Sequence, residues 1–431
     1  MKILVIGSGG REHAICAAFA KSSRVSHIFW APGNAGIAEV AECVPIRHDE
    51  VERLADFAAE KGIDLAFAGG ETPLALGIAD EFARRGLRLV GPEKAAARLE
   101  ASKSFAKDLM KRHGVPTARY FTARSRQEAA EKLAEGVFGD ETGPVVVKAD
   151  GLAAGKGVVV AKDRNEALKA ISELDSIAGK EAATTIVLEE CLVGREVSLL
   201  LFADGENFAL MPPARDHKRI GEGDTGPNTG GMGTFTDDAL LGETQTRKIV
   251  EDIVRPTLAG CSAEGFPFKG VLFLGLMIGR PAGQPEAEET PYVIEYNVRF
   301  GDPETQSILV RLETDLVDIC EAILSGTLGG VDIKWQPGSS ATIVLAAEGY
   351  PEKPRTGDVI TGIGPAAASE GVSIFHAGTA RDAEGRLITA GGRVIGVTAL
   401  AENLNAALEK AYAAAAKISW KGMQFRRDIG S

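Results

Sequence analysis

Three polar side chains alternate along one apolar run of the sequence. The stretch YVIEYNVRF (292–300) places Glu295, Asn297 and Arg299 two residues apart, so in a strand they share one face. The apolar residues between them are expected on the opposite face: Ile294, Tyr296 and Val298. Carboxylate and amide oxygens suit Mg²⁺, which takes further ligands from water and phosphates, and an arginine would face the charge of phosphoryl or acyl transfer. The alternative is the polar outer face of an antiparallel strand pair.

A glycine-rich loop joins two valine-rich runs in VVVKADGLAAGKGVVVAK (145–162). It is not a Walker A loop, because only three residues separate Gly151 from Gly155, Gly157 stands where Ser or Thr would hold magnesium, and a strand pattern follows instead of a helix. We expect a hairpin whose backbone amides approach an anion, with Lys148 and Lys156 converging on phosphates. The alternative is an ordinary glycine-rich hairpin with surface lysines.

Two further stretches suggest a nucleotide site. In IVLEECLVGREVSL (186–199) an apolar run ends in Glu189 and Glu190, and Glu196 follows on the next strand. Backbone groups after a strand can read an adenine edge, and a carboxylate can accept ribose hydroxyls, although acidic residues at strand ends are usually solvated. The loop DHKRIGEGDTGPNTGGMG (216–233) is long enough to suggest function, but we assign its His217 no catalytic role.

The first hundred residues alternate apolar runs with helical patterns, which predicts a doubly wound parallel sheet. Its glycine-rich turns, at 7–10, 32–36 and 69–73, would lie at the carboxyl ends of the strands, where ligands bind in such sheets. A dinucleotide site is weakly supported, because the run at 27–31 leads into Pro32 with no ribose-binding carboxylate.

Beyond residue 94 the pattern predicts a mixed middle and a β-rich end. We expect one helix over about 95–113, a hairpin of strands at 196–205 and 206–215, and a helix near 243–264. A strand pair at 270–280 and 292–300 follows, with a solvated extension at 281–290. From about 330 the chain is β-rich and ends in a helix. The predicted α/β chain therefore divides into 1–102, 103–328 and 329–431.

Composition limits the partners of the chain. Its 431 residues are 45% hydrophobic and 25% charged, with a formal net charge of -12, which disfavours a nucleic-acid partner. MKILVIG leads directly into a strand pattern without signal-peptide features, and no run reaches the roughly 18 apolar residues of a membrane helix. The five cysteines are scattered along the sequence, and we expect them to be reduced thiols that form no disulfide framework. We expect a cytoplasmic protein without a membrane or nucleic-acid partner.

Eight motifs occur in an order that resembles one family. They are GSGGREHA, APGNAG, SKSFAKDLM, VVVKADGLAAGKGV, LEECLVGREVS, DHKR…DTGPNTGGMG, IEYNVRFGDPETQ and FHAGT. Together they resemble the motifs of the phosphoribosylamine–glycine ligases of the ATP-grasp superfamily, and the resemblance extends along essentially the whole chain. The resemblance implies an N-terminal substrate-binding unit (1–102), a central ATP-grasp domain (103–328) with a small lid subdomain at about 120–190, and a β-rich C-terminal domain (329–431). It also implies that ATP, glycine and 5-phosphoribosylamine give glycinamide ribonucleotide, ADP and phosphate in purine synthesis.

The resemblance carries roles over to individual residues. The implied ATP-binding residues are Lys103, Lys148, Gly155, Lys156, Gly157, Glu189, Glu190, Leu192 and Glu196. The implied ligands of Mg²⁺ or Mn²⁺ are Glu295 and Asn297. The implied substrate-binding residues are Gly9, Gly10, Asn34, Glu71, Asp216, Arg299 and Asp302, with Arg299 also catalytic.

Two departures from the family pattern bear on the substrate site. Gly70 stands where the family usually has proline, and Ser8 where asparagine is common. The implied mechanism passes through glycyl phosphate without a covalent enzyme intermediate. The alternatives are another ATP-grasp carboxylate–amine ligase or a nucleotide-binding regulatory protein. Oligomeric state, a monomer or a weak dimer, stays open.

Overall fold

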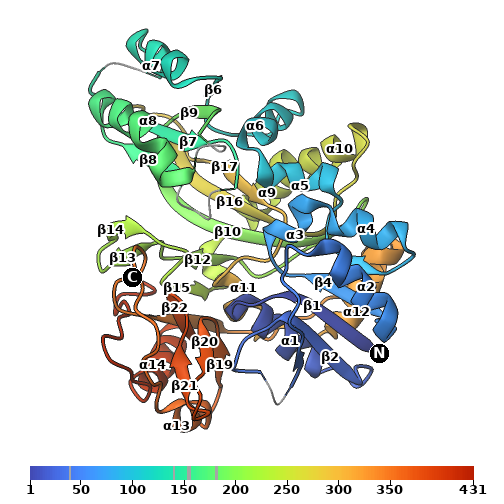
Figure 1. Ribbon diagram of the computed structural model, residues 1–431. Coiled ribbons are helices and arrows are strands. Elements are labelled where there is room, and N and C mark those ends of the chain that lie inside the picture. The colour runs from blue at the N-terminus through green and yellow to red at the C-terminus, as the bar shows by residue number, and fades with distance from the viewer. Residues whose placement is uncertain (38–39, 139–140, 153–156, 180–182) are drawn as a thin grey trace.

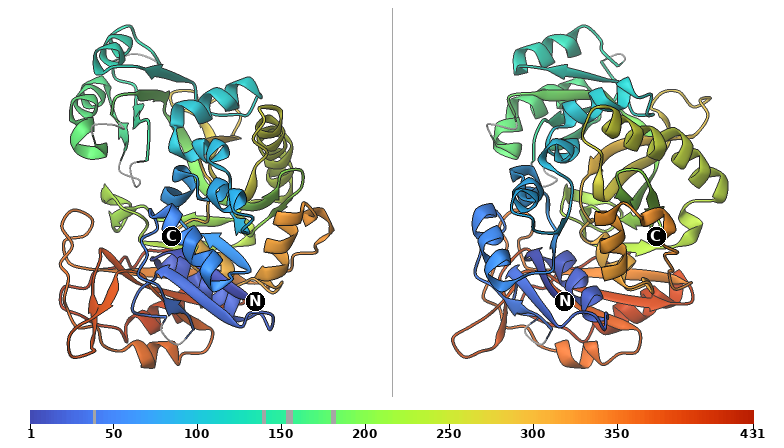
Figure 2. Two further views of the ribbon diagram at one scale, coloured as in Figure 1. Left: turned by 45° about the vertical axis from the view of Figure 1, so that its right-hand side comes forward. Right: turned by 90° about the vertical axis from the view of Figure 1, so that its right-hand side faces the viewer.

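The computed structural model describes residues 1–37, 40–138, 141–152, 157–179 and 183–431 (Figure 1). Three sheets organise it. A small four-stranded unit stands away from the parts that contain the two ends of the chain, as two further views also show (Figure 2). No helix of the described part combines the length and apolarity needed to cross a membrane.

The N-terminal sheet is parallel throughout, which confirms the predicted doubly wound unit. Its strands run in the order β3 (Glu42–Cys43), β2 (His27–Pro32), β1 (Lys2–Gly7), β4 (Leu65–Ala68) and β5 (Leu89–Val90). Alternate residues of β1 enter two different cores: Leu4 and Ile6 belong to one that includes Leu54, whereas Ile3 and Val5 belong to another that includes Phe19. Burial on both faces explains why the strands read as continuous apolar runs.

Helices begin directly beyond the carboxyl ends of these strands. The connecting and flanking helices are α1 (Gly10–Ala20), α2 (Val51–Lys61), α3 (Glu71–Leu76) and α4 (Ile78–Arg84). The turns after β1 and β4 are so close that a Cβ on Gly69 would lie 2.3 Å from Glu12 Oε1. Glycine is therefore required at position 69, and Glu71 is held at the edge of the sheet where ligands bind.

A long antiparallel sheet crosses the middle of the chain and continues into its C-terminal part. Its order is β17 (Thr290–Asn297), β16 (Lys269–Pro281), β10 (Leu192–Asp204), β12 (Ala214–Asp216), β15 (Gly233–Thr236), β18 (Ser339–Ala346), β22 (Arg393–Ala401) and β19 (Val372–His376). The short β11 (Phe208–Leu210) pairs with β10, so the predicted hairpin after residue 196 is confirmed. The strand pair 270–280 and 292–300 is confirmed as β16 and β17.

The four-stranded unit contains the glycine-rich loop. Its order is β6 (Tyr120–Ala123), β9 (Ile186–Glu190), β7 (Val145–Ala149) and β8 (Val158–Ala161), with α7 (Arg126–Ala134) and α8 (Arg164–Ala178) packed on it. β7 and β8 are antiparallel neighbours, so the loop joins two strands, as predicted. Gly155 and Lys156 lie outside the described residues.

The single helix predicted over 95–113 was wrong. The structure has α5 (Lys94–Ala101) and α6 (Lys103–Arg112), separated by Ser102 in an extended conformation (φ -137°, ψ 112°). The Ser102 hydroxyl accepts a hydrogen bond from the Phe105 amide at 3.2 Å, which caps α6. The helix near 243–264 is confirmed as α9 (Glu243–Ile249) and α10 (Arg255–Ala263), joined through a π-helical turn at Val250–Val254.

The C-terminal part packs on the N-terminal sheet through two buried histidines. It adds the hairpin β20 (Thr379–Arg381) and β21 (Leu387–Thr389) and the helices α13 (Ile363–Ala367) and α14 (Leu404–Ala415). The His376 amide donates to His13 Nδ1 at 2.9 Å, and the two rings stack with centroids 5.7 Å apart. Burial and His376 lower the pKa of His13 to about 3, and burial and Arg381 lower that of His376 to about 4.

This contact predicts acid-sensitive stability. Both folded-state pKa values lie below that of an unfolded histidine, so protons bind the unfolded chain preferentially and stability is lost as the pH falls below about 6.5. By pH 4.5 the loss attributable to His13 should reach roughly 3 kcal/mol. Urea unfolding of the wild type and of His13→Gln at several pH values tests this expectation. An equally steep acid dependence in both proteins would contradict it.

Candidate functional site

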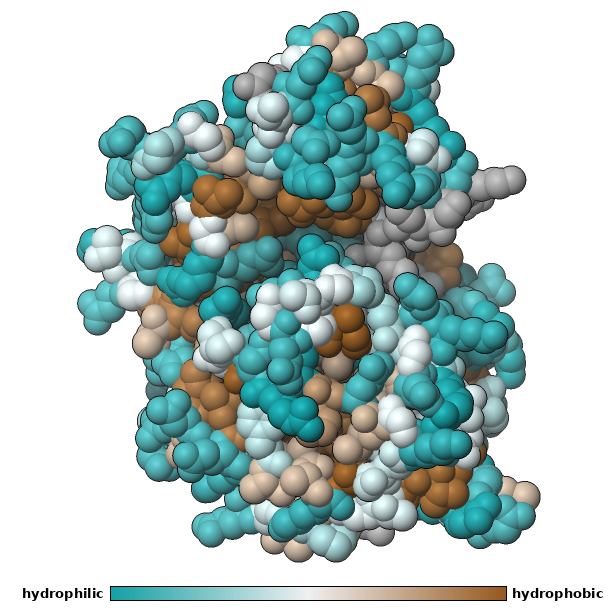
Figure 3. All heavy atoms as spheres, turned by 90° about the vertical axis from the view of Figure 1, so that its left-hand side faces the viewer, coloured by the Kyte–Doolittle hydropathy of each residue, from teal (hydrophilic) through white to brown (hydrophobic). Residues whose placement is uncertain are grey.

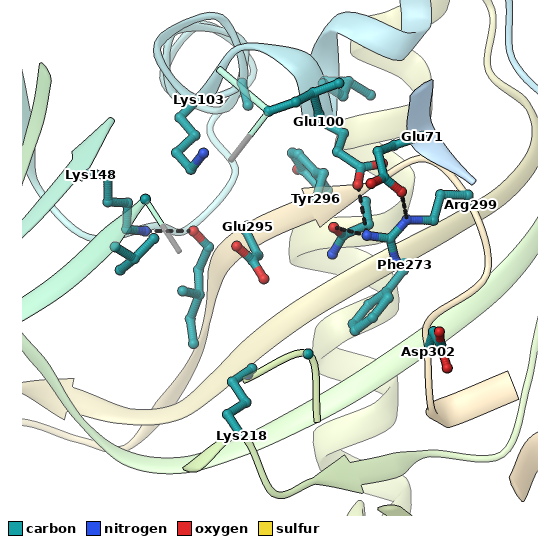
Figure 4. A pocket seen from close by; sticks show the side chains of 18 of the residues that line it. Glu71, Glu100, Lys103, Lys148, Lys218, Phe273, Glu295, Tyr296, Arg299 and Asp302 are labelled. Carbon is teal, nitrogen blue, oxygen red and sulfur yellow. Dashed lines mark hydrogen bonds and ion pairs between the residues drawn. The ribbon is translucent and has the colours of Figure 1, made fainter. Parts of the chain in front are cut away.

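A cavity of about 310 Å³ opens where the three sheets meet, lined by residues from positions 11 to 393. Seen from the side that lies on the left in Figure 1, the surface is hollowed below the uppermost unit and apolar residues gather there (Figure 3). Inside the cavity, Lys103 and Lys148 lie at one end, Arg299 with Glu71 lies at the other, and Glu295 lies between them (Figure 4). A cavity of this size with convergent polar groups has the properties of a ligand site.

The lysine end is formed by residues that enter the cavity from α6 and β7. Lys103 is the first residue of α6, and its Nζ donates to the Gly151 carbonyl at 3.0 Å, which ties the helix to the glycine-rich loop. Burial lowers the pKa of Lys103, partly opposed by Glu295. Lys148, near the end of β7, is buried and donates to the Ile294 carbonyl at 3.1 Å. Gly157 also lines this end.

The two glutamates that end β9 face opposite sides of the sheet. Glu189 lines the cavity and lies 2.8 Å from Lys148 Nζ and 2.9 Å from Lys107 Nζ. Glu190 instead accepts from the backbone amide and Nε of Arg119, at 2.8 and 2.7 Å. Strand alternation separates them, so the Glu190 side chain does not join the predicted site.

The remaining predicted nucleotide residues lie beside the cavity and do not line it. Leu192 is the first residue of β10, and Glu196 follows further along the same strand. The Glu196 carboxylate lies 2.7 Å from Lys218 Nζ and is about half exposed. Lys218 itself lines the cavity.

Arg299 is clamped by two carboxylates from the N-terminal half of the chain. Its Nε lies 3.3 Å from Glu71, its Nη2 lies 2.9 Å from Glu100, and the same Nη2 donates to Asn297 Oδ1 at 3.1 Å. Burial opposes ionisation of Glu71, but Arg299 and Arg11 outweigh this effect and lower the pKa of Glu71 to about 2. Burial raises the pKa of Glu100, although Arg299 opposes this.

A β-bulge modifies the predicted face of β17. Glu295, Asn297 and Arg299 all line the cavity, but the register shifts between Gly275 and Leu276 on β16, which leaves Ile294 as an extra residue. Ile294 and Tyr296 also line the cavity, so the prediction that they lie on the face opposite to the polar residues was wrong for both. Bulges redirect side chains in this way.

A further buried carboxylate, that of Glu304, lines the cavity. Glu304, the first residue of α11 (Glu304–Leu309), is 4% exposed and accepts from the Ser198 hydroxyl at 3.3 Å. Burial and Asp216 raise its pKa to about 7. Burial also raises the pKa of Asp216, partly opposed by Lys218, which lies 3.4 Å away.

The arginine end receives residues from both ends of the chain. Asp302 Oδ2 lies 2.6 Å from Arg393 Nη2, and Gln306 donates to Asp302 Oδ1 at 2.8 Å. Arg393 also donates to the Gly230 and Asp302 carbonyls. Arg11 lies 2.6 Å from Glu12 and donates to the Phe300 carbonyl at 3.1 Å.

Three predicted substrate residues are engaged with the protein itself and do not line the cavity. The Gly9 amide donates to Glu12 Oε2 at 2.7 Å, and a Cβ on Gly10 would lie 2.7 Å from Gln306. Asn34 donates to the carbonyls of Ser8 and His376 and accepts from the Gly36 amide. These residues shape the wall behind the cavity.

The structure adds cavity residues to which the sequence reasoning gave no role. They are Arg11, Glu100, Lys107, Lys218, Glu304 and Arg393. Four of them lie within motifs already singled out, GSGGREHA, SKSFAKDLM, DHKR and GDPETQ, and charged residues there could have been considered. Glu100 and Arg393 lie in unremarkable stretches, where only tertiary contacts reveal them.

Comparisons with known proteins agree with this geometry. Models of the phosphoribosylglycinamide synthetase family match the chain as its N domain (residues 1–100), its ATP-grasp (A) domain (101–305) and its C domain (340–431). The chain belongs to this family. A phosphoribosylamine–glycine ligase of Xanthomonas campestris pv. campestris is 46% identical over 433 residues, covering 100% of this chain and 97% of the relative.

Solved structures support the same assignment. The crystal structure of a phosphoribosylamine–glycine ligase from Thermotoga maritima is 34% identical, covers 100% of both chains and has a TM-score of 0.82. A biotin carboxylase domain of the 2-oxoglutarate carboxylase of Hydrogenobacter thermophilus, at 17% identity, 98% and 91% coverage and a TM-score of 0.71, shares the fold. The chain is thus an ATP-grasp ligase, a class that uses ATP with a divalent metal ion.

Gly70 offers a test of the arginine end. A Cβ at this position would lie 2.9 Å from Arg11 Nη2, whereas the backbone (φ -111°, ψ 167°) accommodates alanine. Gly70→Ala should leave the free energy of unfolding within about 1 kcal/mol but displace the Arg11 guanidinium. We expect a higher KM for the non-nucleotide substrates and an unchanged KM for ATP. A change in the KM for ATP alone would contradict this placement of Arg11.

Proposed function

We propose that the chain joins glycine to 5-phosphoribosylamine, with conversion of ATP to ADP and phosphate, through a glycyl phosphate intermediate. Family membership along nearly the whole chain supports the reaction, and the cavity supports the division of labour within it. The decisive observation is that Lys103 and Lys148 lie at one end and Arg299 is fixed at the other, with the Glu295 carboxylate between them (Figure 4). We place the reaction in the cytoplasm; all five cysteines, each in the described part of the chain, are free.

The donor set beside Lys148 fits Mg²⁺ or Mn²⁺. Glu295 and Asn297 line the cavity, and Asn297 Oδ1 also accepts from Arg299 Nη2 at 3.1 Å. Such cations accept a carboxylate and an amide oxygen supplemented by water and phosphate oxygens. No group of three or more His, Cys, Asp or Glu that could hold a metal occurs among the described residues. The bound ion would neutralise charge on the nucleotide phosphates.

The protein contributes position and electrostatics to the reaction. In the first step the glycine carboxylate attacks the γ-phosphate of ATP and displaces ADP, which gives glycyl phosphate, with Lys103 and Lys148 holding the phosphates. In the second step the phosphoribosylamine nitrogen attacks the acyl carbon, and phosphate leaves. Glu71 and Glu100 hold Arg299 in one orientation, so its charge is already in place when negative charge develops.

The second step releases a proton, and Glu304 is placed to accept it. The amine nitrogen loses one N–H proton as it becomes an amide, and the Glu304 carboxylate takes that proton at the middle of the cavity. Asp216 faces Glu304 from β12, and Lys218, Arg299 and Arg393 face it from the surrounding segments. A base with a pKa near the working pH is the most effective.

The proposed function divides the chain into three units, one of which carries a lid. We retain units at 1–102, 103–328 and 329–431, with residues of about 120–190 acting as a lid over the nucleotide. The antiparallel sheet that continues from β15 into β18 supports a close attachment of the last unit to the central one.

Glu295→Ala tests the metal assignment. Mutation of a residue that merely hydrogen-bonds a metal ligand typically lowers metal affinity or activity by about 10–100-fold. Loss of the ligand itself should therefore lower kcat by at least about 100-fold while the fold is kept. Glu286→Ala, which removes an exposed carboxylate from the extension between β16 and β17, is the control and should be fully active. ADP release is measured with ATP and Mg²⁺, omitting glycine or phosphoribosylamine in turn. Wild-type turnover without either substrate would refute the ligase assignment.

Glu304→Gln tests the proton acceptor. The wild-type kcat should rise with pH through an apparent pKa near 7, because protonated Glu304 cannot accept a proton. Glutamine should lower kcat by about 100-fold and remove this acid limb, with little effect on the KM for ATP. A variant that keeps the wild-type pH profile would exclude Glu304 as the base.

A further inference from the structure

A lysine that the proposed chemistry does not use is buried in the wall of the cavity. The Lys107 side chain is 2% exposed, and its Nζ lies 2.9 Å from Glu189 Oε2. The same Nζ donates to the Thr117 hydroxyl at 2.7 Å, and that hydroxyl donates to the Val293 carbonyl at 2.6 Å. Lys107 is thus fixed on two sides, and its ammonium group is directed at the Glu189 carboxylate.

Glu189 shares its charge between two lysines. Its Oε1 lies 2.8 Å from Lys148 Nζ, and its side chain is 4% exposed. Lys148 has a further anchor in the Ile294 carbonyl, 3.1 Å away. The buried group therefore contains two ammonium ions and one carboxylate, with one excess positive charge beside the lysine end of the cavity.

The three charged residues come from three elements, and the anchors come from a fourth. Lys107 belongs to α6, Lys148 to β7 and Glu189 to β9, whereas Val293 and Ile294 belong to β17, the strand that carries Glu295. The cluster therefore joins the four-stranded unit to the strand proposed to hold the metal ion. A displacement of either side would change the position of Lys148 relative to Glu295.

The burial of this cluster determines what its carboxylate can do. Burial opposes ionisation of Glu189, yet Lys148 and Lys107 keep its pKa below the usual value. Burial lowers the pKa of Lys107 to about 8, against the opposing effect of Glu189. The two oxygens of this carboxylate lie 2.8 and 2.9 Å from ammonium groups, so an adenine edge could bind Glu189 only in competition with these ion pairs.

We propose that Lys107 and Glu189 are positioning residues that hold Lys148 toward the nucleotide phosphates, and that the Glu189 carboxylate acts on Lys148 and not on the adenine base. This inference rests on the nucleotide-binding part of the proposed function. Glu189 fixes the Lys148 ammonium, and Lys107 balances the carboxylate so that the cluster keeps its excess positive charge. Without Lys107, Glu189 and Lys148 form a neutral pair and the attraction for phosphate falls.

Lys107→Met tests the charge balance. We expect the affinity for ADP with Mg²⁺, measured by titration calorimetry, to fall by at least about 10-fold, the value of a contact to a charged group, whereas adenosine affinity stays within about twofold. Lys111→Met is the matched control, because Lys111 is exposed on the same helix, and it should bind both ligands as the wild type does. Unchanged ADP affinity, or an equal loss for adenosine, would overturn the proposal.

Glu189→Gln separates the two roles of the carboxylate. If it positions Lys148, ADP binding weakens by at least about 10-fold and adenosine binding is retained. If the carboxylate reads the base, adenosine binding weakens as much as ADP binding does, and the proposal fails.

A milder pair of variants tests the same role if Lys107→Met and Glu189→Gln, which remove buried charges, unfold the protein. Thr117→Val removes the hydroxyl that orients Lys107, whereas Thr117→Ser keeps it. Valine should weaken ADP binding by several-fold and serine should not; equal affinities would count against the positioning role.

These measurements also separate this inference from the ligase assignment. Binding of ADP requires neither glycine nor phosphoribosylamine. If Lys107→Met weakens ADP binding as expected but the wild type shows no ligation, the ligase function is refuted and the positioning role stays intact. A wild type that binds no ADP would overturn both.

Discussion

Arg299, a partly buried residue, forms the ion pairs on which the site depends. It follows β17, and its two carboxylate partners begin α3 and end α5, so it joins the central sheet to the N-terminal unit. Removing one partner of a buried ion pair is strongly destabilising, because the remaining charge has left water. The need to satisfy this arginine therefore fixes the position of Glu71 and Glu100 relative to the strand that carries Glu295.

Local patterns predicted the strands and the polar face of the site. The period of two placed Glu295, Asn297 and Arg299 together, and the parallel N-terminal sheet followed from its continuous apolar runs. The same period could have separated Glu189 from Glu190, but both were assigned to one ligand. The bulge at Ile294 could not be foreseen, because it depends on the pairing of β17 with Gly275 and Leu276 of β16.

Other parts of the site depend on contacts between distant segments. Arg393 donates to Asp302, which is 91 residues away in the sequence. Glu100 accepts from the Val298 amide, which is 198 residues away. Nothing in the spacing of either residue indicates its partner, since chain order does not determine which loops meet at a cavity. The break at Ser102 was a local signal that was missed: a serine followed by a helical run is a typical N-cap, and it places Lys103 at the start of α6.

The distribution of charge gives the two ends of the cavity different capacities. At the arginine end each guanidinium already faces a carboxylate: Arg11 faces Glu12, Arg299 faces Glu71, and Arg393 faces Asp302. At the lysine end Glu189 is shared by two ammonium groups, and Lys103 makes its described hydrogen bond to a neutral carbonyl.

A polyphosphate gains most where positive charge is least compensated and water is excluded. In the proposed function the lysine end would therefore receive the triphosphate, and Glu295 would supply the carboxylate oxygen that a divalent cation requires. The acyl phosphate would then form between this end and Glu304, next to the fixed charge of Arg299.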